Sequence, residues 1–476
     1  MRQARTILVL GTLALIAVPA AAQGPTNLRP RVLEYVTVNA PVVALTHVKV
    51  IDGTGAPARA DQTIVIRDGR IAAMGSAAST QIPAGAEVRD LTGHSVIPGM
   101  IGLHDHLFYT AAGNRSAQMT FTGPRLYLGS GVTTVRTTGS RAPYAEINLK
   151  EGIELGQEPG PRIHITAPYI TGGEGSNTMT LINTPEEARR FVKYWGEEGA
   201  TWLKAYTNIG REQLRAAIEE AHATGMKVTG HLCSVSFREA VALGIDNLEH
   251  GLFTNSDYAP DKEPDRCPGG LVSAVGMVDV KGPAVQETFR VMVRNNVAMT
   301  STLAVYELFV PNRPTKDERT LQMMAPEVRA DYLSARERID TERNTAYTPE
   351  VFRNGMAYER AFFEAGGLLA AGVDPTGNGG ALPGFGDQRN FELLSEAGFS
   401  PAQVVQIMTL NGAKVLGIDR DLGSIETGKI ADLAVMPGDL TTDPALIRGI
   451  HLVFKDGIGY DARRLLADCE GLIGIR

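Results

Sequence analysis

Residues 96–109 read VIPGMIGLHDHLFY and place two histidines, His104 and His106, one residue apart at the end of an apolar run. On a β-strand, side chains at positions i and i+2 share a face, so both imidazoles are expected to point the same way while Asp105 points to the other side. Such a pair can hold a metal ion, or it can be two polar residues where a buried strand reaches the surface. The other strand ends of the chain have to decide between these interpretations.

Short apolar runs recur after this stretch, and segments with helical spacing separate them. With residues 96–104 counted as the first, there are eight such runs. The later ones occupy residues 132–137, 162–167, 200–206, 227–231, 246–250, 297–302 and 366–374. Helices are predicted at residues 184–199 and 210–225, because each segment opens with a plausible cap and closes at a glycine. Eight β/α units predict an α/β fold of the (β/α)8 TIM-barrel type.

The two ends of the mature chain have β character instead. Residues 33–97 and 421–476 alternate apolar and polar side chains, so we expect them to form one small β-sandwich domain beside a barrel at residues 98–420. Residues 252–285 and 306–345 interrupt the β/α rhythm. In a barrel both would emerge at the carboxyl ends of the strands, where long insertions act as lids or substrate walls.

The N-terminal segment is typical of a cleavable signal peptide. It carries Arg2 and Arg5, an apolar run at residues 7–18, and small residues up to Ala22. The run is too short for a membrane span, which needs roughly twenty apolar residues. We therefore expect residues 1–22 to be removed, leaving a periplasmic or secreted protein without a membrane anchor.

Composition excludes several classes of partner and site. The formal net charge is -7 and no dense basic cluster is present, so no nucleic-acid partner is expected. The three cysteines, Cys233, Cys267 and Cys469, allow at most one disulfide and contain no CxxC pair for zinc. A metal site must therefore use histidines, carboxylates or a less usual ligand. The oligomeric state is left open, and a homo-oligomer is compatible with the sequence.

Polar residues that suit metal binding stand at the ends of four further predicted strands. Lys204 follows the apolar run ATWL, and a buried lysine is costly unless it is paired or chemically altered. His231, His250 and Asp374 each end a different strand, which is where barrel enzymes place their chemistry. Four histidines and an aspartate exceed the needs of one tetrahedral zinc ion. Because a lysine that captures CO2 becomes a carbamate able to bridge two ions, we expect two divalent metal ions, with Zn²⁺ as the expected metal.

Six stretches carry a resemblance to a known family: VIPGMIGLHDH, GATWLKAY, AHATGMKVTGH, GIDNLEHG, AAGVDPTG and LNGAKVLGIDRDLGSIETGKIADLAVM. In them the chain resembles the amidohydrolase superfamily, nearest to its prolidase-like and imidazolonepropionase-like branch. The resemblance covers about residues 40 to 440. It implies a binuclear metal centre, in which Asp374 exchanges a proton as general acid and base. The implied ligands are His104, His106 and Asp374 for the buried ion, His231 and His250 for the more exposed ion, and carbamylated Lys204 with a hydroxide bridging both.

The function implied is hydrolysis of a C–N bond by attack of that bridging hydroxide. A small amide such as a dipeptide, an N-acyl amino acid or an aryl amide would be the substrate. A lactone or phosphoester hydrolase is the alternative, because the same nucleophile attacks those centres. A non-catalytic relative that keeps the barrel as a binding scaffold is the alternative from another class.

Three residues are candidates for substrate binding. Tyr206 should share a face with Lys204 and donate to an oxyanion or a substrate carboxylate, with simple packing as the alternative. Arg136 is a candidate for a substrate carboxylate, with a structural ion pair as the alternative. Glu174 stands where prolidase-like relatives often have a histidine. Gly102 also departs from the family, which usually has an aspartate at that position.

Overall fold

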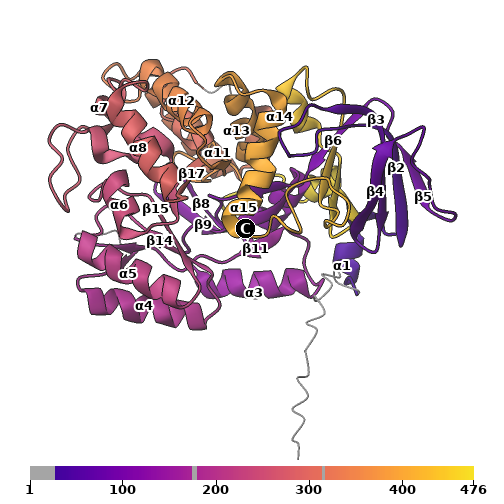
Figure 1. Cartoon of the computed structure of the whole chain (residues 1–476), viewed down its shortest axis with the longest axis horizontal. Coiled ribbons are helices and arrows are strands. Elements are labelled where there is room, and N and C mark those ends of the chain that lie inside the picture. The colour runs from indigo at the N-terminus through magenta and orange to yellow at the C-terminus, as the bar shows by residue number, and fades with distance from the viewer. Residues whose placement is uncertain (1–26, 174–178, 314–316, 476) are drawn as a thin grey trace, which may run out of the picture.

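The computed structural model describes residues 27–173, 179–313 and 317–475. A large α/β body has a smaller region of β-strands at one side (Figure 1). The predicted signal peptide and Glu174 lie outside the described residues. In the described part of the chain, no helix has the length and apolar character needed to cross a membrane.

Every strand predicted for the alternating region is found, each inside its predicted run, which confirms the α/β fold. These strands are β7 (Met100–Gly102), β10 (Val132–Arg136), β11 (Arg162–His164), β14 (Trp202–Ala205), β15 (Lys227–Gly230), β16 (Asn247–Glu249), β17 (Ala298–Ser301) and β18 (Leu369–Ala371). Neighbours among them pair in parallel. The carboxyl ends of the strands, where the ligand-type residues stand, therefore meet at one edge.

The parallel strands belong to two sheets, ordered β11-β10-β7 and β13-β12-β14-β15-β16-β17-β18. The two added strands are β12 (Ile170–Thr171) and β13 (Thr180–Leu181). Backbone hydrogen bonds join the sheets at both sides: the Thr201 amide donates to the Ile165 carbonyl at 2.9 Å, and the Leu103 amide to the Ala371 carbonyl at 2.8 Å. This arrangement is consistent with a (β/α)8 barrel.

Helices follow the strands and cover the sheets (Figure 1). They include α2 (Thr122–Gly129), α3 (Pro143–Glu154), α4 (Pro185–Glu197), α5 (Arg211–Ala223), α6 (Phe237–Leu243), α8 (Pro283–Arg294), α12 (Pro349–Glu364), α13 (Phe385–Glu396), α14 (Pro401–Gln406), the π-turn η3 (Ile407–Asn411) and α15 (Gly412–Leu416). Both predicted helices are confirmed as α4 and α5. The start of α4 is set by a capping box, in which the Thr184 hydroxyl accepts from the Glu187 amide and the Glu187 carboxylate accepts in return.

The two insertions contain helices of different lengths, of which the longest has 16 residues. These are η1 (Gly251–Thr254), η2 (Ser256–Tyr258) and α7 (Leu271–Val275) in the first, and α9 (Leu303–Glu307), α10 (Glu318–Met323) and α11 (Pro326–Thr341) in and around the second. A disulfide joins Cys233, just after β15, to Cys267 in the first insertion, while Cys469 is free and buried. The hairpin of β8 (Phe108–Ala111) and β9 (Arg115–Gln118) was not predicted.

Strands from both chain ends form the smaller region, as predicted. They are β1 (Val36–Val38), β2 (Val42–Val50), β3 (Arg59–Arg67), β4 (Arg70–Ser76), β5 (Glu87–Asp90), β6 (His94–Pro98), β19 (Leu433–Pro437), β20 (Leu452–Lys455) and β21 (Ile458–Asp461). The β-sandwich is not confirmed, because in the described residues hydrogen bonds run through a single nine-stranded sheet, β1-β21-β20-β19-β6-β2-β3-β4 with β5 on β2. Short helices accompany it: α1 (Pro30–Leu33), η4 (Pro444–Gly449) and α16 (Ala462–Ala467).

Candidate metal centre

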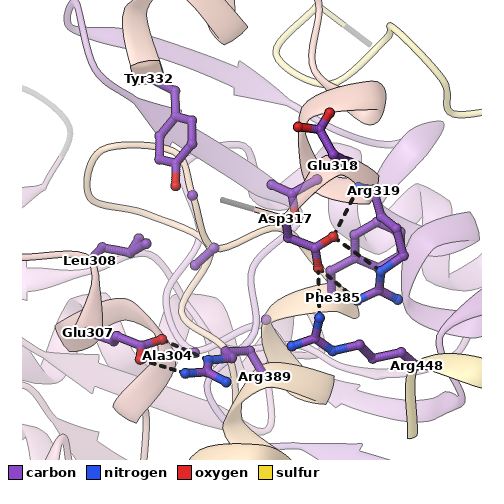
Figure 2. A pocket seen from close by; sticks show the side chains of 14 residues that line it. Ala304, Glu307, Leu308, Asp317, Glu318, Arg319, Tyr332, Phe385, Arg389 and Arg448 are labelled. Atoms are coloured by element: carbon purple, nitrogen blue, oxygen red, sulfur yellow. Dashed lines mark hydrogen bonds and ion pairs between the residues drawn. The ribbon is translucent and has the colours of Figure 1, made fainter. Parts of the chain in front are cut away.

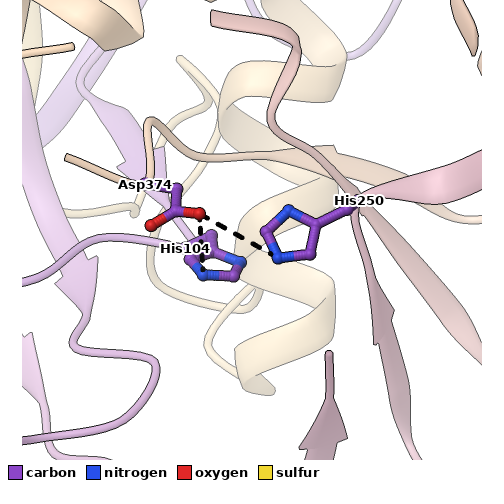
Figure 3. A group of neighbouring side chains, drawn as sticks. All are labelled: His104, His250 and Asp374. Atoms are coloured by element: carbon purple, nitrogen blue, oxygen red, sulfur yellow. Dashed lines mark ion pairs between the residues drawn. The ribbon is translucent and has the colours of Figure 1, made fainter. Parts of the chain in front are cut away.

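Three of the predicted ligands meet at the carboxyl ends of the strands. His104, His250 and Asp374 each offer an atom within 4.8 Å of the other two (Figure 3). The Asp374 carboxylate lies 3.8 Å from His104 Nε2 and 4.0 Å from His250 Nε2. All three side chains are buried. This group combines residues that the sequence analysis divided between two ions.

The remaining predicted ligands surround this group. His106 Nε2 lies 3.3 Å from Asp374 Oδ1, and the His231 ring centre lies 4.5 Å from that of His250. Lys204 is fully buried, and its amine has no hydrogen-bond partner among the described residues. A buried amine without a partner is expensive, so this position calls for a chemical change or a ligand.

Three of the histidines contact the protein through Nδ1. His106 Nδ1 lies 3.1 Å from a backbone carbonyl oxygen, which can only accept, so this nitrogen carries the proton. His104 Nδ1 lies 2.8 Å from the Glu249 carboxylate, and His250 Nδ1 lies 2.6 Å from a threonine hydroxyl. Because Nδ1 is occupied, the Nε2 atoms remain available to a metal ion.

The Glu249 carboxylate connects His104 to buried polar side chains of the fold. Its Oε2 contacts His104, while its Oε1 accepts from Arg136 Nη2 at 2.6 Å, from Asn247 Nδ2 at 2.8 Å and from the Thr229 hydroxyl. Three donors on one oxygen leave the other oxygen for the imidazole. Glu249 thus links the interior of the fold directly to His104, a predicted ligand.

Arg136 is part of this interior layer. Its guanidinium is fully buried, pairs with Glu249, and donates through Nε to the Leu103 carbonyl at 2.7 Å. It also lies over the Trp202 ring, 4.4 Å from its centre. The structure therefore favours the ion-pair alternative for Arg136 over a contact with substrate.

The electrostatics prepare the side chains for a metal. Burial lowers the pKa of His104 and of His250 well below the usual value, and lowers that of His231 to about 3. Burial also lowers the pKa of Lys204 to about 8. Burial alone would raise the pKa of Asp374, but the adjacent histidines hold it well below its usual value. Neutral imidazoles and an ionised carboxylate are the forms that bind metal ions.

Two of the predicted ligand residues have unusual backbone conformations. His250 has a φ of 68° and Asp374 a φ of 51°, in the left-handed region that residues other than glycine rarely adopt. Such conformations cost about 1–3 kcal/mol each and cluster at functional sites. The strain agrees with a role for this group beyond packing.

The donor set fits divalent metal ions. It combines neutral imidazoles with one carboxylate, and both the Lys204 amine and His250 Nε2 are buried without a hydrogen-bond partner in the described part of the chain. Imidazole and carboxylate ligands of this kind suit Zn²⁺ and similar ions. Buried polar atoms without a partner are rare in folded proteins and call for an explanation.

Gly102 has a structural explanation. A Cβ atom at this position would lie 1.8 Å from Asp105 Oδ2, so the Asp105 carboxylate fills the space that another side chain would need. Asp105 is fully buried and accepts a hydrogen bond from the Val373 amide at 3.1 Å. It therefore braces the backbone next to Asp374.

Tyr206 lies at the edge of the site. Its ring packs against His231, with centres 4.6 Å apart, and against Tyr169 at 5.5 Å. Burial raises the pKa of Tyr206 to about 12, so the hydroxyl stays protonated and can donate. This position agrees both with donation of a hydrogen bond to substrate and with simple packing.

Some residues of the site were missed from the sequence. Glu249 directly precedes His250, and Phe108, whose ring stacks on His106 at 4.4 Å, follows that histidine by two positions. Only their positions next to His250 and His106 in the sequence could have indicated that Glu249 and Phe108 belong to the site. Tyr169, with its hydroxyl 3.4 Å from His106 Nε2, could not be distinguished from a core tyrosine.

An α/β fold that gathers histidines, a lysine and an aspartate at the ends of parallel strands is typical of metal-dependent hydrolases. A model of the amidohydrolase family matches residues 95–458, well over half of the chain. The chain belongs to the amidohydrolase family, and it is accordingly an enzyme that hydrolyses carbon–nitrogen bonds.

Individual relatives agree with this family. The dihydroorotase of Pelotomaculum thermopropionicum is 24% identical over 412 residues, which cover 81% of this chain and 87% of the relative. A candidate prolidase from Bifidobacterium longum has a TM-score of 0.62 at 26% identity, covering 90% of this chain and 98% of its own. A Xaa-Pro dipeptidase solved with methionine in its active site has a TM-score of 0.66 at 21% identity, covering 88% and 100%, and shows the likeness of fold.

Proposed function

We propose that this protein is an exported amidohydrolase with two divalent metal ions, acting on the amide bond of a small substrate such as a dipeptide, an N-acyl amino acid or an aryl amide. The observation that carries the proposal is the buried, unpartnered Lys204 beside four histidines and Asp374. A single ion would not need the lysine. A carbamate on Lys204 would satisfy the site by bridging two ions.

The residues that would hold the ions are those inferred from the sequence. They are His104, His106, His231, His250, Asp374 and carbamylated Lys204. When bound, two such ions lower the pKa of a water molecule and polarise the carbonyl of the substrate. We propose Zn²⁺ as the metal, on the basis of the imidazole-rich donor set.

The chain's own side chains would handle protons and orientation. Asp374 is ionised and lies within 4.0 Å of three imidazoles, so it is placed to accept a proton and to return it to the departing amine. Glu249 fixes the orientation of His104. The protonated Tyr206 hydroxyl would donate to the oxygen that gains charge in the transition state.

The domain organisation and the export of the chain are part of the same proposal. We propose that the eight strands form a (β/α)8 barrel within residues 98–420, flanked by the sheet of residues 33–97 and 421–476. Residues 1–22 would direct export and then be removed.

Metal analysis of the purified protein, with Lys204→Ala as the test variant, examines the proposal. We expect about two tightly bound metal ions per wild-type chain, and a loss of metal together with a drop in activity of about 10³-fold in K204A. Lys227→Ala is the matched control, because Lys227 lies in the neighbouring strand β15 and donates to a backbone carbonyl away from the site.

Added propionate should partly rescue K204A, since it can return a carboxylate to the vacated space. Fewer than one tightly bound metal per wild-type chain, together with unchanged activity in K204A, would contradict the proposal.

A further inference from the structure

Arg141 places a cation beside the metal centre. It lies in the loop after β10, and its guanidinium carbon is 4.5 Å from the centre of the Phe108 ring. Phe108 in turn stacks on the His106 imidazole, with ring centres 4.4 Å apart and planes inclined by 26°. The guanidinium is therefore separated from a predicted metal ligand by a single aromatic ring.

The loop that carries Arg141 is held in place. Gly139 has a φ of 98°, and a Cβ atom there would lie 2.5 Å from the Tyr169 ring, so only glycine lets the loop pass so close. Ser140 forms a parallel backbone bridge with Pro168. The position of Arg141 is therefore built into the fold rather than left to a free loop.

One edge of the Arg141 guanidinium is unused. Nη1 donates to the Ser116 hydroxyl at 2.8 Å. Nε is buried without a hydrogen-bond partner, and among the described residues Nη2 donates to none and no carboxylate forms an ion pair with Arg141. The Nε and Nη2 atoms together form an edge that matches the two oxygens of a carboxylate.

Neighbouring arginines differ in this respect. Arg136 pairs with Glu249, and Arg115 of the nearby hairpin pairs with Asp331. A buried donor left without a partner costs about 1–3 kcal/mol, so an anionic ligand that satisfied Arg141 would recover that cost. Arg141 thus keeps an unpaired edge, among the described residues, one aromatic ring away from the predicted metal ligand His106.

We propose that Arg141 binds a carboxylate of the substrate, and that the enzyme acts on N-acyl amino acids or dipeptides rather than on uncharged aryl amides. This inference rests on the proposed function and narrows its substrate class. The Phe108 ring between His106 and Arg141 then lies along the part of the substrate that joins the scissile carbonyl to its carboxylate. Arg141 is in this view a specificity residue, and Asp374 with the metal ligands carries out the chemistry.

The experiment uses matched pairs of compounds. A panel of N-acetyl amino acids is compared with the same amides lacking the carboxylate, for example N-acetyl-L-leucine with N-(3-methylbutyl)acetamide. In Arg141→Met we expect KM for the acids to rise about 10- to 100-fold with little change in kcat, since a charged hydrogen-bonded pair is lost. Arg141→Lys should be intermediate, because it keeps the charge and loses the bidentate edge.

Arg115→Met is the matched control, because it removes a nearby arginine that already has a carboxylate partner. A second readout is independent of turnover: the rise in melting temperature that each acid produces in wild type and in R141M. Equal preference for acids and carboxylate-free amides in wild type would overturn the inference, and so would an unchanged preference in R141M. If wild type cleaves neither compound but is stabilised by the acids through Arg141, the proposed reaction fails while the carboxylate site stands; if the acids give no stabilisation and no turnover, both fail.

Discussion

Arg136 and Arg141 stand close together in the chain but in two different regions of the molecule. Arg136 is fully buried and paired with Glu249, whose other oxygen contacts the predicted ligand His104. Arg141 lies at the level of the histidines, over the Phe108 ring, with one edge of its guanidinium unpaired among the described residues. The pocket of Figure 2 repeats the paired pattern, with Arg389 paired to Glu307 and Arg448 paired to Asp317.

The difference shows how burial assigns a role to a charge. An ion enclosed by strands has no access to ligand or water, so it must be paired within the protein to be tolerated. A charged side chain that borders the site, as Arg141 does, can instead form its ion pair with a substrate. The interior is therefore expected to control metal binding and stability, and the open edge to control substrate choice.

Replacing Glu249 by Gln would break the interior region and should have the largest effect. Arg136 would keep its charge without a carboxylate, which costs about 3–5 kcal/mol of stability. Because three donors need an acceptor on the Arg136 side, the new amide would turn its NH₂ group toward His104 and favour the wrong tautomer. We expect metal affinity to fall about 10- to 100-fold in chelator competition.

Glu307→Gln is the matched control for E249Q, because Glu307 is also buried and paired with arginines but contacts no ligand histidine. If E249Q does not fold, the double variant Glu249→Met with Arg136→Met removes both charges and keeps the volume. Metal affinity equal to wild type in either variant would show that Glu249 does not position His104.

The Cys233–Cys267 disulfide tests how firmly the first insertion is held, because it ties this insertion to the segment after β15. Its cysteines are 34 residues apart, and the chain-entropy model assigns a crosslink of this span about 3–4 kcal/mol. Reduction should lower the denaturation midpoint accordingly. The Cys233→Ser, Cys267→Ser double variant should start at the lower value and not respond to reductant, and a midpoint unmoved by reduction in wild type would refute a stabilising role.

A smaller, pH-dependent effect contrasts Glu249 with Glu359, a buried glutamate without a charged partner among the described residues. Glu359 of α12 forms no ion pair within the described chain, and burial raises its pKa from 4.5 to about 8, although a hydrogen bond from Ser301 lowers it in part. The folded protein therefore holds this proton more tightly than the unfolded chain. The stability associated with it is present at low pH and is lost as the pH rises from about 4.5 to 8.

Glu359→Gln cannot ionise and should remove this dependence. We expect the stability of E359Q relative to wild type to increase by about 1–3 kcal/mol between pH 5 and pH 8.5, measured by chemical denaturation. Parallel pH profiles for the two proteins would mean that Glu359 finds a partner or water when ionised.

Much of the fold could be predicted because it depends on local pattern. The eight strands were recognised from apolar runs, and α4 and α5 from their caps and terminal glycines. The predicted ligand residues lie close together because parallel strands carry their carboxyl ends to one edge, which brings together residues as distant in sequence as His104 and Asp374; their role as ligands stays a prediction. The sheet of the chain ends was expected, but its strand pairing was not, since alternation does not reveal whether one sheet or two will form.

The sequence by itself determined the order of strands and the kinds of side chain at their ends, because both follow from short-range spacing. Only the tertiary structure decided that Glu249 and Arg136 pair, that Cys233 joins Cys267, and that one edge of Arg141 has no partner in the described part of the chain. Those outcomes depend on which loops and strands pack together across long separations. A charge next to a metal site acquires its role from what surrounds it in space, and no local pattern records that.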